Sequence, residues 1–115
     1  MTANPNTVWT KLCTKADLIP FSGVAAWHED QQVALFYLPG NDTEVFAIGN
    51  HDPFSGANVL ARGIVGDLKG ELVVASPLYK QHFSLTSGAC LEDAGTRVPV
   101  WPVRLKGDDV EIVSA

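Results

Sequence analysis

Short runs of alternating apolar and polar residues, rich in β-branched and aromatic side chains, recur along the chain. Runs of this kind between turn residues predict β-strands. The predicted strands cover residues 8–13, 23–28, 32–38, 44–50, 63–67, 71–76, 82–85, 97–105 and 109–113. In the first of them, the period of two places Val8, Thr10 and Leu12 on one face. Eight or more short strands at this spacing predict an all-β fold, a small antiparallel sandwich or barrel.

Turn chemistry separates the predicted strands. Polar or Gly-containing triplets predict hairpins at residues 29–31, 68–70 and 106–108. Pro39-Gly40-Asn41-Asp42 is a further strong turn signal. Pro99 and Pro102 cannot donate a hydrogen bond to a neighbouring strand, so we expect the 97–105 strand to lie at an edge or to carry a bulge. Helix is almost absent, and only a single turn around residues 56–60 is predicted.

The composition limits the possible functions. A chain of 115 residues with 46% hydrophobic residues fits one domain, residues 1–115, with a sizeable core. The net charge of −5 and the scattered basic residues argue against nucleic acid as a partner. No apolar run approaches the roughly 20 residues of a membrane span, and the N-terminus lacks the pattern of a signal peptide. We therefore expect a cytoplasmic protein whose residues 1–6 are frayed.

Cysteines and tryptophans offer few functional clues. Cys13 and Cys90 belong to no Cys-x-x-Cys or Cys-His pair, and we expect both to be reduced, buried thiols. Trp9, Trp27 and Trp101 are expected to anchor the core or a sheet edge. A tryptophan on the surface would be a hot spot for a partner, and the sequence does not show which one that is.

Two loops stand out between predicted strands. Residues 50–57 read NHDPFSGA and residues 76–79 read SPLY, and Phe83, Leu85 and Gly88 follow the second loop. This arrangement resembles the cluster-binding half of a Rieske domain. In that family two thiolates and two imidazoles from two such loops hold a [2Fe–2S] cluster.

The resemblance implies four ligand positions, and none of them carries a suitable ligand. Ser76 and Tyr79 stand where the family has Cys and His in the second loop, and Asn50 and Asp52 are expected to stand there in the first. An iron–sulfur cluster needs thiolate ligands. The resemblance therefore implies a Rieske-like fold that has lost its cluster, with no cofactor or metal bound by this chain.

Three longer segments resemble one family in particular, the small subunits of bacterial assimilatory NAD(P)H-dependent nitrite reductases. They are TVWTKLCTKADLIPFSGVAAW at 7–27, EVFAIGNHDPFSGANVLARGIVGD at 44–67 and GELVVASPLYKQHFSLTSGACLED at 70–93. The resemblance implies a cytoplasmic enzyme that reduces nitrite to ammonium in nitrate assimilation. It also implies a partner, the large subunit, which carries FAD, an iron–sulfur cluster and sirohaem. This chain would have no catalytic residue of its own.

The loop tips are the expected docking face toward that partner. Pro53, Phe54, Leu78 and Tyr79 are the candidate partner-binding residues, because rigid loop tips remain usable for binding after a ligand site is lost. The alternative function is a Rieske-type electron-transfer protein that holds a [2Fe–2S] cluster or another metal centre after all. A third possibility, a small-molecule binding module, would be favoured by a large apolar pocket.

Other candidate chemistry is weaker. His51, Asp52 and His82 could be imagined as metal ligands, but their spacing matches no known metal site. Ser76 precedes Pro77 and lacks the flanking glycines of a nucleophile elbow, which argues against a catalytic serine.

Overall fold

The computed structural model describes residues 8–114, so the expectation for residues 1–6 lies outside it. Its elements in chain order are β1 Val8–Thr14, η1 Lys15–Asp17, β2 Ser22–His28, β3 Gln31–Tyr37, β4 Val45–Gly49, η2 Leu60–Arg62, β5 Ile64–Leu68, β6 Glu71–Ala75, β7 His82–Ser84, β8 Val100–Trp101, β9 Val103–Lys106 and β10 Asp109–Ser114. Here η denotes a short 3₁₀-helix. The predicted all-β class with almost no helix is confirmed.

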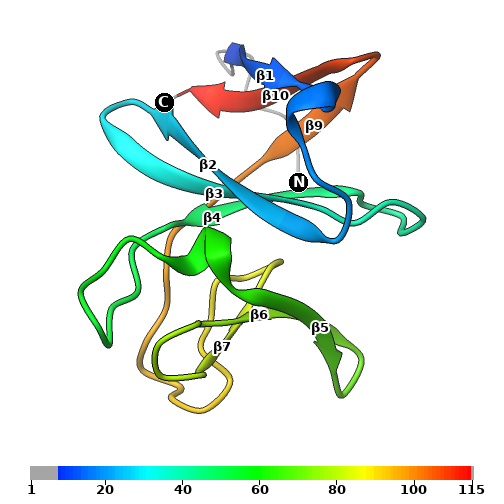
Figure 1. Ribbon diagram of the computed structural model, residues 1–115. Helices are drawn as coiled ribbons and strands as arrows, with labels where there is room; N and C mark the ends of the chain where they lie inside the picture. The colour runs from blue at the N-terminus through cyan, green and yellow to red at the C-terminus, as the bar shows by residue number, and fades with distance from the viewer. Residues whose placement is uncertain (1–7, 115) are drawn as a thin grey trace.

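Three antiparallel sheets are stacked in layers (Figure 1). Their strand orders are β1-β10-β9, β2-β3-β4-β8 and β5-β6-β7. An upper cluster of buried residues lies between the first two sheets: Leu18, Val33, Leu35, Tyr37, Val45, Ala47, Val110 and Ile112. A lower cluster lies between the central sheet and the third one: Ala34, Phe36, Leu38, Phe46, Ile48, Leu60, Ala61, Val74, Phe83, Leu85, Cys90 and Val98.

Strand β3 supplies both clusters. Val33, Leu35 and Tyr37 point into the upper cluster, and the residues between them point into the lower one. Because successive side chains of a strand point to opposite faces, a strand between two cores must be apolar on both. This double burial explains why residues 33–38 form a continuous apolar run.

Two of the predicted hairpins have two-residue turns with positive φ angles. Glu29 and Asp30 join β2 to β3 with φ angles of 49° and 65°. Lys69 and Gly70 join β5 to β6 with φ angles of 55° and 85°. Positive φ at both central residues defines the type I′ turn, whose twist matches that of paired strands. The hairpins are confirmed.

The predicted face of the first strand is wrong. Val8 and Thr10 are exposed, whereas Leu12 packs against the upper cluster. The register of β1 against β10 shifts between Lys11 and Cys13, which is a β-bulge. A bulge inserts one extra residue and so reverses which face the following side chains share.

The predicted strand 97–105 is two strands. Pro102 separates β8 from β9, and the two lie in different sheets, each at an edge. The edge location agrees with the inability of proline to donate a hydrogen bond. The predicted helical turn at residues 56–60 lies slightly later, as η2.

Helix η1 was not predicted. Its N-cap residue is Thr14, and Asp17 Oδ2 accepts from the Thr14 backbone N–H at 2.9 Å and from the Thr14 hydroxyl at 3.0 Å. The sequence signal for this cap is the spacing of Thr14 and Asp17, because a Ser or Thr followed three residues later by an acidic residue often begins a helix.

The cysteines and tryptophans can now be placed. Cys90 is a buried free thiol, whereas the free thiol Cys13 is only half-buried, less than expected. The Arg104 guanidinium lies over the Trp9 ring, with Cζ 4.0 Å from the ring centroid. Trp101 packs edge-on against His28. Trp27, in contrast, is 68% exposed. Within residues 8–114, no helix has the length and apolar character needed to cross a membrane.

Candidate functional site at the two loops

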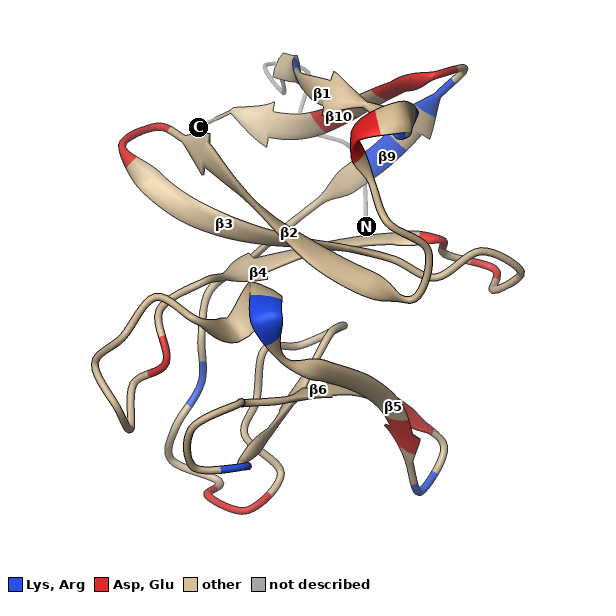
Figure 2. Ribbon diagram, viewed as in Figure 1, with Lys and Arg blue, Asp and Glu red and all other residues tan. Residues whose placement is uncertain are grey.

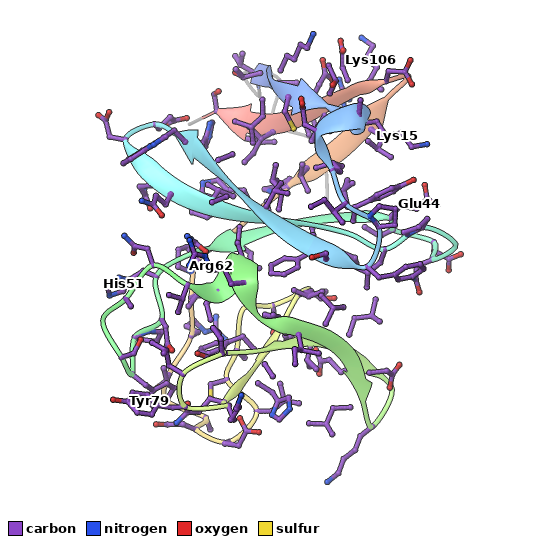
Figure 3. All side chains as sticks on the ribbon, viewed as in Figure 1. Lys15, Glu44, His51, Arg62, Tyr79 and Lys106 are labelled. Carbon is purple, nitrogen blue, oxygen red and sulfur yellow. The ribbon has the colours of Figure 1, made fainter. Side chains whose placement is uncertain are left out.

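The two loops singled out in the sequence lie on the same side of the molecule. The first connects β4 to η2, and the second connects β6 to β7 (Figure 1). Figure 3 labels one residue from each, His51 and Tyr79, and both lie to the left of the lower half in that view.

The loops share one hydrogen-bond pattern. In the first, the Asp52 N–H donates to the Ala57 carbonyl at 2.9 Å and the Gly56 N–H donates to the Asp52 carbonyl at 2.8 Å. In the second, the Ser76 N–H donates to the Gln81 carbonyl at 2.9 Å, and the N–H four residues after Ser76 donates to the Ser76 carbonyl at 3.1 Å. Each loop therefore contains a closed six-residue segment, which runs from Asp52 to Ala57 in the first loop and from Ser76 to Gln81 in the second.

The backbone conformation is also shared. The fifth residue of each loop has a positive φ angle, 77° at Gly56 and 68° at Lys80. Glycine adopts this conformation without strain, whereas a lysine there costs about 1 kcal/mol. The matching geometry makes Asp52, the first residue of its loop, the counterpart of Ser76.

This equivalence favours a different alignment of the first loop, in which Asp52 takes the first position. Asn50 was expected at the first ligand position, but it lies two residues before the loop closes. Its amide group instead holds neighbouring elements together: Nδ2 donates to Gln32 Oε1 at 2.9 Å, and Oδ1 accepts from the Ala61 N–H at 2.7 Å. With Asp52 at the first position, the Cys-x-His spacing of the family places Phe54 at the second.

Asp52 and Ser76 are bonded to each other. Both are fully buried, and the Ser76 hydroxyl donates to Asp52 Oδ2 at 2.6 Å. The other carboxylate oxygen accepts from the Phe54 N–H at 2.9 Å. Burial acts to raise the pKa of Asp52, but the hydrogen bonds from Ser76, Phe54 and Ser55 outweigh it, so the pKa lies below its ordinary value. A charged carboxylate therefore joins the two loops.

The side chains at the other two positions, Phe54 and Tyr79, do not contact Asp52 and Ser76 in the same way. Phe54 is half-buried against the lower cluster, with its ring 6.2 Å from that of Phe83. Tyr79 is 61% exposed. The structure thus brings two of the expected positions, Asp52 and Ser76, into contact and leaves Asn50 and Tyr79 apart from them.

These residues do not fit an iron–sulfur cluster. The site offers a carboxylate and a hydroxyl bonded to each other, a half-buried phenyl ring and an exposed phenol, whereas the cluster requires thiolates and imidazoles. In the described part of the chain, no three His, Cys, Asp or Glu residues gather closely enough to hold a metal ion. The histidines considered as ligands have other contacts: His51 Nδ1 lies 3.1 Å from Asn58 Oδ1, and His82 Nδ1 lies 2.6 Å from Glu92 Oε2.

Three of the four candidate docking residues are exposed at the loop tips. Pro53, Leu78 and Tyr79 form what we call the tip surface. The sequence analysis placed Phe54 on this surface too, but its side chain packs against the lower cluster instead. Two hollows of about 250 and 550 Å³ beside the first loop have mixed polar and apolar walls, so they do not favour the small-molecule binding module.

Known proteins share both the fold and much of the sequence of this chain. A family model described as Rieske-like [2Fe–2S] domain matches residues 8–113. The chain is 43% identical over 104 residues to the nitrite reductase (NADH) small subunit of Escherichia coli K12, covering 90% of this chain and 95% of that protein. The solved structure of the Escherichia coli protein NirD superposes with a TM-score of 0.84 at 40% identity, covering 95% of this chain and 98% of that one.

A further relative is much longer than this chain. The nitrite reductase [NAD(P)H] large subunit of Klebsiella oxytoca is 36% identical over 108 residues, which is 94% of this chain but 11% of that protein. A domain of this kind is therefore joined to a large-subunit polypeptide in that relative.

Proposed function

This chain belongs to the family of Rieske-like [2Fe–2S] domains and, within it, to the small subunits of NADH-dependent nitrite reductase, and from this premise we propose that it is the non-catalytic small subunit of such an enzyme. It docks to the large subunit and supports it. The complete enzyme uses NADH or NADPH to reduce nitrite to ammonium in the cytoplasm during nitrate assimilation.

The hydrogen bond between Asp52 and Ser76 is the observation that carries this proposal. It connects the two loops at the point where the family would place a cluster. The two residues that form it supply neither a thiolate nor an imidazole. The residues at this point can join the two loops through a hydrogen bond but cannot ligate a cluster, so we infer that the loops serve binding. FAD, an iron–sulfur cluster and sirohaem on the large subunit supply the electron transfer when bound there.

The long relative supports association with a large subunit. Because its matching stretch belongs to one polypeptide with the rest of the large subunit, the two parts are held together covalently in that protein. We infer that the separate chain described here makes the corresponding contact non-covalently.

The tip surface is the proposed docking face. Leu78 and Tyr79 are 51% and 61% exposed, which is more apolar exposure than a loop tip needs for solubility. The loop under them is stiff, since it is closed by its own backbone hydrogen bonds and joined to its neighbour through Ser76. A stiff apolar tip loses little conformational freedom on binding.

Affinity purification of the tagged chain from its native cells tests the proposal. We expect the large subunit to co-purify, and NADH- or NADPH-dependent nitrite reduction to fall when this chain is deleted and to return when it is added back. Deletion that leaves both the large subunit and its activity unaltered would contradict the proposed role.

The alternative, an electron-transfer protein with its own metal centre, predicts a different result from the same preparation. A [2Fe–2S] protein absorbs visible light because of its cluster. We expect the isolated chain to be colourless, since the four ligand positions carry the wrong chemistry.

A further inference from the structure

Strand β2 forms an open edge of the central sheet. It pairs with β3 through seven consecutive residue pairs, and no other strand lies on its outer side among the residues described. An edge strand presents unpaired N–H and C=O groups, which can template the addition of another strand.

The other sheet edges within residues 8–114 are blunted. Natural proteins protect edges with charge, proline, bulges or short strand length. The protecting features are the bulge and Lys11 in β1, Arg104 and Lys106 in β9, Asp67 in β5, the two-residue length of β8 between Pro99 and Pro102, and the three-residue length of β7.

β2 has none of these features. Its sequence SGVAAWH contains no Lys, Arg, Asp, Glu or Pro, its histidine is buried, and its register is unbroken over all seven residues. A long, uncharged and regular edge is a pairing site unless something covers it.

The hairpin turn determines which groups face outward. A two-residue turn makes the residues on either side of it, His28 and Gln31, a hydrogen-bonded pair. Such pairs alternate along an antiparallel ladder, so Gly23, Ala25 and Trp27 direct their N–H and C=O groups away from β3. The side chains of Ala25 and Trp27 are also exposed.

A hollow follows this edge. Gly23, Val24 and Ala25 of β2 line it together with Gln32, Asn50, Asn58, Ala61 and Arg62, so it extends from the edge across the face of the sheet toward β3, with a volume of about 550 Å³. An adjoining hollow of about 250 Å³ continues the path beside Trp27, Gln32 and His51. The hollows therefore offer room for side chains of a segment that pairs with this edge.

Charge indicates what kind of segment fits. Arg62 is exposed at the hollow, and the ion pairs formed among the described residues do not include it. Acidic residues dominate the chain as a whole, with a net charge of −5 (Figure 2). An unpaired guanidinium in a largely acidic molecule matches a carboxylate on the occupant.

We propose that the outer edge of β2 binds an extended segment of the large subunit as an added strand, with an acidic side chain of that segment at Arg62 and a small or apolar one against Trp27. This inference rests on the proposed function and extends the docking face beyond the tip surface. The hollow adjoins the first loop, because Asn58 lines it together with Arg62 and Asn58 Oδ1 lies 3.1 Å from His51 Nδ1. Main-chain hydrogen bonds would provide affinity, and Trp27 and Arg62 would provide selectivity.

Binding of purified large subunit to single-residue variants tests the proposal. Ala25→Lys places a charge on the edge, and Arg62→Glu reverses the charge at the hollow. We expect each to weaken binding by about tenfold or more. Ile64→Lys is the matched control, because Ile64 is 74% exposed on β5, an edge strand of a different sheet, and we expect that variant to bind like the unmodified chain. Melting temperatures of all three variants show that they are folded.

Hydrogen exchange on the complex gives a second readout. The amides of Gly23, Ala25 and Trp27 should exchange more slowly in the complex than in the free chain, because an added strand accepts hydrogen bonds from them. Unchanged exchange together with unchanged affinity of the Ala25→Lys variant overturns the inference.

The remaining outcomes separate this inference from the proposed function. If Tyr79→Ala abolishes binding while Ala25→Lys and Arg62→Glu bind normally, the proposed function stands and the edge is not used. If the two subunits do not associate at all, both proposals are wrong. If the free chain self-associates and Ala25→Lys prevents this, the edge binds a second copy and the inference is wrong.

Discussion

At the scale of single residues, the contact between Ser76 and Asp52 determines how the two loops are held. The serine hydroxyl is the donor to a buried carboxylate oxygen. Ser76→Ala would leave that oxygen without this donor, which costs about 2 kcal/mol for a hydrogen bond to a charged group. We expect the free energy of unfolding, measured by urea denaturation, to fall by about that amount.

Ser87→Ala is a matched control for this change. Ser87 is exposed, and its hydroxyl accepts one backbone N–H at 3.2 Å, so we expect a much smaller loss. Equal stability of the two variants would mean that Asp52 and Ser76 do not hold the loops together.

The charge of Asp52 predicts a pH dependence. Because the folded-state pKa is lowered, the carboxylate stabilises the fold at pH values above its unfolded pKa of about 3.9, and this stabilisation is lost as the pH falls toward the folded pKa. Asp52→Asn removes the titrating group. We therefore expect the stability difference between the unmodified chain and this variant to be full near pH 6 and to shrink below about pH 4. A difference that is constant between pH 6 and pH 3 would contradict the lowered pKa.

At the scale of elements, the tip surface and the residue beneath it should respond differently to truncation. Leu78→Ala and Tyr79→Ala remove exposed side chains, so we expect them to weaken association with the large subunit by about 2 kcal/mol each and to leave the melting temperature almost unaltered. Phe54→Ala removes a ring that packs against Phe83, so we expect a lower melting temperature.

Binding titrations and thermal unfolding of the same three variants separate these effects. Lower stability with normal binding in the Tyr79→Ala variant would place the docking face elsewhere. The distinction for Phe54 could not be made from the sequence, because an apolar residue after Asp-Pro suits an exposed tip and a packed loop equally well.

The strands and hairpins could be predicted because their signals are local. The apolar run of β3 predicts the strand, and the turn residues Glu29 and Asp30 mark where it begins. The bulge at Lys11 and the sheet change at Pro102 depend on which distant strand pairs with the segment, and a single sequence does not contain that information. For the same reason the alignment of the first loop, Asn50 instead of Asp52, needed the hydrogen-bond pattern of both loops.

At the scale of the whole molecule, the layered core keeps the two thiols apart. Cys13 packs against the upper cluster and Cys90 belongs to the lower one. Burial raises the pKa of both thiols, which reduces the reactive thiolate at neutral pH. We expect slow reaction with a thiol reagent in the native protein and reaction of both cysteines after unfolding without reductant. Absence of thiol reaction after unfolding would indicate a disulfide.

The central claim is that this Rieske-like subunit acts without a cluster of its own. The most direct measurement is the iron and acid-labile sulfide content of the chain after it has been separated anaerobically from the purified complex. The account predicts iron and sulfide in the large-subunit fraction and only traces in this chain. About two iron and two sulfide ions per chain, the content of a [2Fe–2S] cluster, would contradict it.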